Sequence, residues 1–298
     1  MLRRVRGFVG HGETDSQAWH PKCAVTSTTL AHWRESVIEA ALLGIFMVSA
    51  ATFATVLQHP SSPLFVGSGE TIGERIPMGI AMGLTAMTLI YSPWGTRSGA
   101  HMNPAVTLTF WRLNKISGRD ASMYVVAHLI GGLAGITLAT ILLAQLPAHT
   151  AVNYVATLPG AGGSALALIA EFVISCGLML AVLVFSNNSA LARFTGVAAG
   201  ALVCSYIVVE APLSGMSMNP ARSLGPALLA GTLDTMWIYV IGPIAGMLTG
   251  AAIYQRLKTS VTVRCAKLHH PAHSPCIHCG SSATAARALL RRNEEVPV

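Results

Sequence analysis

Two asparagines in matching eight-residue segments are the residues best placed to act on a small polar molecule. Residues 98–105 read Ser-Gly-Ala-His-Met-Asn-Pro-Ala and residues 214–221 read Ser-Gly-Met-Ser-Met-Asn-Pro-Ala, so six of eight positions agree. Asn is a favoured helix N-cap and Pro suits the first helical position, so each segment predicts the start of a helix. The residues concerned are Asn103, Pro104, Ala105, Asn219, Pro220 and Ala221. Each asparagine side chain could donate an N–H to a passing oxygen atom.

Three charged residues lie in or beside apolar stretches. Arg222 follows the second motif directly, at the position where the first motif has Val106, whereas Glu39 and Glu171 lie at matching positions inside apolar runs. An ionisable residue at membrane depth usually faces a water-filled cavity or a partner. We expect Arg222 to line a narrow aqueous constriction, repel cations and donate hydrogen bonds. The two carboxylates could bind a coupling proton, as intramembrane acids do in secondary transporters.

A cluster of histidines and cysteines lies near the end of the chain. The spacing of Cys276 and Cys279 is one that zinc sites use. The surrounding Pro, Ser and His content, however, is typical of disorder. We therefore assign no metal and no cofactor. The histidines of this cluster are His269, His270, His273 and His278.

The elements that must position these residues are membrane-spanning helices. Hydrophobic residues make up 52% of the chain and charged residues only 10%, against about 25% charged in soluble domains. Apolar segments of about the 20 residues that a bilayer requires are predicted at 35–57, 76–92, 121–146, 165–186, 194–210 and 235–256. The apolar stretches after Asn103 and Asn219 are too short to cross. The first runs into Arg112 and the second into Gly231, a residue type common at helix C-caps.

The order of these segments predicts an inverted internal repeat. Each half reads span, span, half-helix, span, so an odd number of crossings separates the two copies. The half-helices then enter from opposite faces, and their positive dipole ends, each worth roughly +0.5 charge, meet near the midplane. A cation or proton meets a barrier there, while the two asparagines donate to a passing water oxygen and reverse the hydrogen-bonded water chain.

Charge placement predicts the orientation in the membrane. Six spans put both termini on one side, which then carries nearly all of the Lys and Arg residues; only Arg75 and Arg222 fall opposite. Both termini are expected to be cytoplasmic, in the plasma or inner membrane. We divide the chain into a disordered extension (1–32), a channel domain (33–256, with repeats near 33–146 and 164–256) and a basic, disordered tail (257–298). The cysteines form no disulfide framework, the basic residues form no nucleic-acid-binding face, and no nucleophile–base pair indicates an enzyme.

The sequence resembles the major intrinsic protein family, the aquaporins and aquaglyceroporins. The resemblance covers about residues 33–256 and rests on the paired Asn-Pro-Ala motifs with Arg222 after the second. It implies an all-α bundle of six tilted helices and two half-helices, a pore in each subunit and a homotetramer in membrane lipid. It also implies that Glu39 and Glu171 accept hydrogen bonds from the loops that lead into the half-helices. The selectivity filter that it implies is Met82, Ile207, Met216 and Arg222.

The filter residues leave the solute open. Strict water channels of the family have His at the Ile207 position and an aromatic residue at the Met82 position, so this filter is expected to be less polar and wider. Glycerol, urea or ammonia could then pass with water. Ser223 and Ala227, by contrast, resemble water channels, because glycerol channels carry Asp and a basic residue there. A proton-coupled transporter using Glu39 and Glu171 is the main alternative, and a non-conducting scaffold protein is a third.

Overall fold

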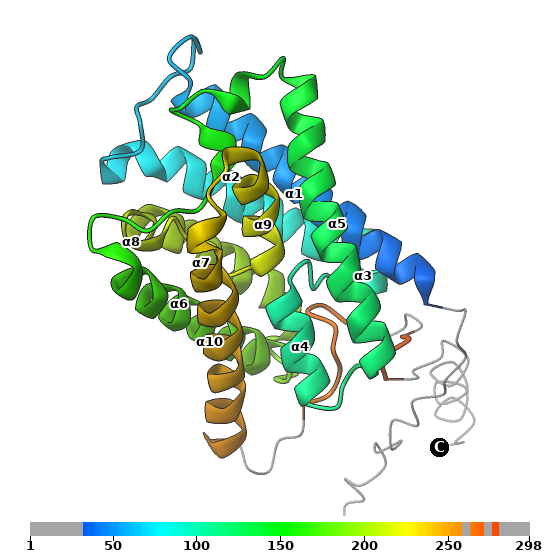
Figure 1. Ribbon diagram of the computed structural model, residues 1–298. Coiled ribbons are helices and arrows are strands. Elements are labelled where there is room, and N and C mark those ends of the chain that lie inside the picture. Colours follow the sequence, from blue (N-terminus) through cyan, green and yellow to red (C-terminus); the bar gives the residue numbers. More distant parts are fainter. Residues whose placement is uncertain (1–31, 258–262, 271–275, 280–298) are drawn as a thin grey trace, which may run out of the picture.

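The computed structural model is an all-helical bundle (Figure 1). It describes residues 32–257, 263–270 and 276–279. The predicted extension before residue 32 lies outside the described residues, as does His273. Within the described part, the long helices are α1 (Trp33–Gln58), α2 (Ile72–Tyr91), α5 (Gly118–Leu142), α6 (Gly163–Ser186), α7 (Thr195–Val209) and α10 (Met236–Leu257). The shorter α-helices are α3 (Pro93–Ser98), α4 (Pro104–Arg112), α8 (Ala211–Ser214) and α9 (Pro220–Ala230).

The six long helices coincide with the six predicted spans. Five of the six helical segments are long and apolar enough to cross a membrane: those of α1, α5, α6, α7 and α10. Helix α2 has 20 residues, and its first turn contains Glu74 and Arg75, which lower its mean hydropathy. Each of these helices also exposes large apolar side chains at the molecular surface, as expected for contact with lipid. Examples are Ile45, Ile80, Ile130, Val173, Val209 and Ile241.

Helix pairing follows the inverted repeat. Helix α1 packs along α5, its counterpart α6 packs along α10, and α2 packs against its own counterpart α7. Small residues allow the close approach, as they do between helices in lipid. A Cβ atom added at Gly131 would fall onto the backbone of Ala40 in α1, and one added at Gly246 would fall onto the carbonyl oxygen of Phe172 in α6. In both halves, therefore, a glycine allows the close contact between the first and the last long helix.

The short helices α4 and α9 are capped as the motifs predict. The Asn103 Oδ1 atom accepts from the Ala105 N–H at 2.8 Å, and Asn219 Oδ1 accepts from the N–H groups of Ala221 and Arg222. Helix α4 ends at Arg112. Helix α9 ends at Ala230, and its C-cap residue Gly231 has a left-handed φ of 71°, which suits glycine. In Figure 1 the two helices lie one above the other in the middle of the bundle, with their amino ends facing each other.

The structure differs from the sequence-based prediction in the tail. Residues 263–270 and 276–279 were expected to be disordered, but most of them are buried against the channel domain. The Arg264 N–H donates to Asn187 Oδ1 at 2.7 Å, and the Leu268 N–H donates to the Gly99 carbonyl at 3.1 Å. This part of the tail therefore belongs to the folded body of the protein.

Candidate functional site

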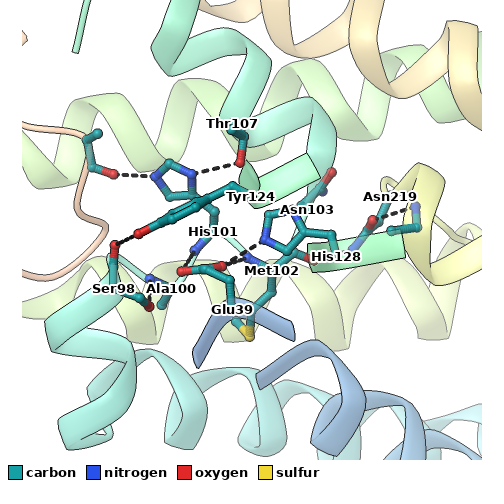
Figure 2. A network of polar contacts seen from close by, with 12 residues as sticks. Glu39, Ser98, Ala100, His101, Met102, Asn103, Thr107, Tyr124, His128 and Asn219 are labelled. Atoms are coloured by element: carbon teal, nitrogen blue, oxygen red, sulfur yellow. Dashed lines mark hydrogen bonds and ion pairs between the residues drawn. The ribbon is translucent and has the colours of Figure 1, made fainter. Parts of the chain in front are cut away.

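The two motif asparagines bind each other's loops at the meeting point of the half-helices. The Asn103 Nδ2 atom donates to the Met218 carbonyl at 2.7 Å, and Asn219 Nδ2 donates to the Met102 carbonyl at 2.7 Å (Figure 2). Each amide group has two N–H bonds. One is used in this exchange, which leaves the second available to a molecule beside the pair. The amino ends of α4 and α9 therefore converge on one place, from opposite directions.

The loop before α4 is held by Glu39. This carboxylate is fully buried, and its oxygens accept from the backbone N–H groups of His101 (3.1 Å) and Met102 (2.6 Å) and from His128 Nε2 (2.8 Å). Figure 2 shows Glu39 below the loop, with His128 beside it. Hydrogen bonds to an ionised group are the stronger kind. Glu39 thus fixes the backbone that presents Asn103.

Glu171 does the same for the loop before α9. It is fully buried and accepts from the N–H groups of Ser217 and Met218, both at 2.7 Å, and from the Ser214 hydroxyl at 2.8 Å. A second pair of matching contacts supports each loop from the following span. Tyr124 in α5 donates to the Ser98 carbonyl at 2.8 Å, and Tyr239 in α10 donates to the Ser214 carbonyl at 2.7 Å.

The loops have a strained backbone that these contacts maintain. In the first loop Ala100 and Met102 have φ values of 55° and 49°, and in the second Met216 and Met218 have values of 52° and 54°. Non-glycine residues rarely adopt this left-handed region, and such strain persists only where the surroundings impose it. The same pair of positions has this backbone conformation in both loops, so the conformation belongs to the internal repeat.

A cavity of about 670 Å³ runs past the asparagine pair. Near one end it is lined by Gln58, Gly69 and Asn153, at the end of α1, before α2 and in the connection before α6. Near the other, which we call the His101 end, it is lined by Ile90, His101 and Leu268. Asn103 and Asn219 line it between these ends. Glu39 and Glu171 do not line it, so the structure places them behind the passage.

The four predicted filter residues all line this cavity: Met82, Ile207, Met216 and Arg222. Arg222 is held by its Nη1 atom, which donates to the Val155 carbonyl at 3.0 Å. Sequence reasoning missed Val155, because a backbone carbonyl leaves no signature in residue type. It also missed Met78, one turn before Met82 on α2, and Leu268 in the tail, both of which line the cavity.

Comparison with known proteins agrees with this geometry. The family model described as major intrinsic protein matches residues 26–254. Aquaporin NIP1-1 of Oryza sativa subsp. japonica is 37% identical over 180 residues, covering 60% of this chain and 61% of that protein, so the match spans about three fifths of the relative's length. A probable aquaporin NIP-type of Nicotiana alata is 37% identical over 206 residues, covering 66% of this chain and 74% of that protein.

A solved structure shares the fold. The X-ray structure of the aquaglyceroporin from Plasmodium falciparum superposes with a TM-score of 0.62 at 20% identity, covering 75% of this chain and 96% of that chain. The family model covers most of the chain. The paired motifs and the inverted half-helices lie within the matched range, as do the long helices except for the last three residues of α10. This chain is a member of the major intrinsic protein family.

Proposed function

We propose that the protein is a passive membrane channel for water and small neutral solutes that excludes protons and ions. One observation carries the proposal: the amino ends of two inverted half-helices meet at reciprocally bonded Asn103 and Asn219, and both asparagines line one long cavity. The relatives described above, which are named aquaporin and aquaglyceroporin, support the same function.

The mechanism follows from the charges at the meeting point. Each half-helix directs the positive end of its dipole, roughly +0.5 charge, at the centre of the passage. Arg222 adds a full positive charge to the cavity wall. Both repel cations, and a proton carried along a water chain meets the same barrier. A water molecule passes because the second N–H of each asparagine amide replaces a hydrogen bond that the water loses.

We propose that Met82, Ile207, Met216 and Arg222 form the selectivity filter. Three of the four are apolar, so this constriction offers few hydrogen bonds to a solute other than those from Arg222. An apolar wall desolvates water at a cost and suits the carbon-bound hydrogens of a small polyol. The filter therefore favours some passage of glycerol, urea or ammonia beside water.

The substitution Ile207→His tests this filter. An imidazole is polar and bulky, so we expect the passage of glycerol and urea to fall more than that of water. Stopped-flow light scattering of proteoliposomes measures all three solutes. Val209→His is the matched control, because Val209 is 70% exposed on the same helix and does not line the cavity. An equal fall for all solutes, or the same change in the control, would contradict the filter assignment.

A second pair of variants tests which α2 residue narrows the passage. Met78 and Met82 both line the cavity, one helical turn apart. If Met82 belongs to the filter, Met82→Phe reduces glycerol passage relative to water more than Met78→Phe does. A larger effect of Met78→Phe would assign the α2 position of the filter to Met78, one turn earlier.

A proton-coupled transporter, the alternative that the sequence leaves open, is not favoured. Glu39 and Glu171 are fully buried, lie outside the cavity lining and accept several hydrogen bonds each. They lack the access to solvent that a coupling site needs. A pH gradient should therefore leave the final solute distribution across proteoliposomes unchanged.

The assembly and orientation are part of the same proposal. The resemblance to the family and the exposed apolar surface of the bundle support a homotetramer embedded in membrane lipid. The excess of Lys and Arg on one side supports cytoplasmic termini in a plasma or inner membrane. Light scattering of the detergent-solubilised protein gives the number of subunits, and protease accessibility in sealed vesicles gives the side of the termini.

A further inference from the structure

Four potential metal ligands come together in the tail, and one of them, Cys265, is not among the cysteines and histidines that the sequence pattern singled out. The side chains of Cys265, His270, Cys276 and Cys279 each place one ligand atom in a cluster, and all four atoms lie within 4.8 Å of one another. The Cys265 Sγ atom lies 3.4 Å from Cys276 Sγ, and His270 Nε2 lies 3.3 Å from Cys279 Sγ. Two of the four residues are buried and two are partly buried.

The ligand types and spacing fit zinc. Structural Zn²⁺ sites are tetrahedral, and three cysteines with one histidine are a common ligand set. Zinc binds thiolates at about 2.3 Å and imidazole nitrogen at about 2.0–2.1 Å, so ligand atoms around one ion lie about 3.4–3.8 Å apart. The Cys265–Cys276 and His270–Cys279 distances are close to these values, and every other pair of ligand atoms lies within 4.8 Å. Small shifts of side chains suffice to admit the ion.

The cluster lies where the tail packs on the His101 end of the cavity. Two residues between Cys265 and His270 bind the channel domain. The Ala266 carbonyl accepts from His101 Nε2 at 2.7 Å, and the Lys267 ammonium donates to the Thr96 carbonyl at 2.8 Å. Near the other two ligands, His278 Nε2 donates to the Ser98 carbonyl at 3.0 Å. The tail, drawn in orange, passes beside α4 in Figure 1.

The same segment reaches the passage itself. Leu268, between two of the ligands in sequence, lines the cavity and is bonded through its N–H to the Gly99 carbonyl. Gly99 begins the loop that ends at Asn103. A shift of residues 265–270 would therefore change both the width of the cavity at this end and the support of the loop that presents Asn103.

We propose that Cys265, His270, Cys276 and Cys279 bind one Zn²⁺ ion, and that this ion holds the tail across the His101 end of the channel and restricts passage through it. An ion bound to three thiolates and one neutral imidazole leaves a net negative charge, and the buried Lys267 lies in the same segment to offset it. The restriction of passage rests on the channel function proposed above, whereas zinc binding does not.

Metal analysis of the full-length protein tests the site. After purification under reducing conditions and loading with Zn²⁺, we expect about one zinc ion per subunit. The double variant Cys276→Ser/Cys279→Ser should lose most of it. The matched control, Cys176→Ser/Cys204→Ser, changes the same number of cysteines in α6 and α7 and should retain it. Replacement of zinc by Co²⁺ should give the intense thiolate-to-metal absorption and visible bands of a tetrahedral site in wild type and control only.

Several results would overturn the site. Wild-type protein that binds no zinc, or a double variant that binds as much as the control, excludes these ligands. A mass decrease that reverses on reduction and is lost in Cys276→Ser would show a disulfide in place of a metal site. Co²⁺ bands of an octahedral complex would show a different set of ligands.

Water passage through proteoliposomes tests the effect on the channel. Metal-stripped wild type should pass water faster than zinc-loaded wild type, and the double variant should be fast in both conditions. Equal rates for the two wild-type states would overturn the restriction. Failure of the channel proposal looks different: no state would exceed empty liposomes, although zinc content would still distinguish the variants.

Discussion

At the scale of single residues, the contacts of Ser214 indicate which of two neighbouring carboxyl groups is protonated. These groups belong to Glu171 and to Glu210, which directly follows α7. The Ser214 hydroxyl lies 2.8 Å from Glu171 Oε1 and 2.5 Å from Glu210 Oε1. A hydroxyl has one hydrogen, so it donates to one carboxylate only and must accept from the other. Glu171 already accepts two backbone N–H groups, which favour its ionised form. Glu210 therefore carries the proton that Ser214 accepts.

This assignment predicts different effects on stability for the same substitution at Glu210 and at Glu171. Glu210→Gln replaces a neutral acid by a neutral amide and should leave stability nearly unchanged. Glu171→Gln loses the charge and one acceptor oxygen that serve Ser217 and Met218, at about 1.5–3 kcal/mol for each hydrogen bond to a charged group. Thermal unfolding in detergent measures both. Equal destabilisation by the two variants would contradict the placement of the proton.

At the scale of helices, close packing at glycine holds each half of the repeat together. Helix α5 meets α1 at Gly131, and α10 meets α6 at Gly246, with no room for a side chain at either place. Overpacking of this kind typically costs about 1–3 kcal/mol. Each half should therefore be sensitive to one added methyl group at its own contact.

We expect Gly131→Ala and Gly246→Ala each to lower the thermal unfolding temperature. Gly73→Ala, in the first turn of α2, is the matched control: its added Cβ would meet only Thr71 Oγ1, at 4.0 Å. The control should be neutral, because alanine is the better helix former. If the control were as destabilised as the two contact variants, helix packing at these glycines would not be the cause.

At the scale of the whole molecule, the sequence was sufficient for the bundle because its signals are local or repeated. Apolar length located the six spans, the Asn-Pro pairs located the starts of α4 and α9, and the order of spans gave the inversion. Glu39 and Glu171, which lie at matching positions in the two halves, accept hydrogen bonds from the corresponding loops before α4 and α9.

The remainder depended on contacts that sequence patterns do not encode. The carbonyl of Val155 binds Arg222 through a backbone atom, whatever the side chain. In the tail, Cys265 and His270 lie in irregular chain, and tertiary contacts such as those with His101 and Thr96 hold their segment near Cys276 and Cys279. Composition alone indicated disorder there, because it counts no tertiary partners.

The most direct test of the whole scheme is to measure water and proton movement in one preparation. Proteoliposomes containing a pH-sensitive dye are subjected first to an osmotic step and then to a pH step in the presence of a potassium ionophore. Converging half-helix dipoles at Asn103 and Asn219 predict shrinkage much faster than in empty liposomes, with proton entry no faster than in empty liposomes. Rapid proton entry beside rapid water flow, or no acceleration of water in either metal state, would contradict it.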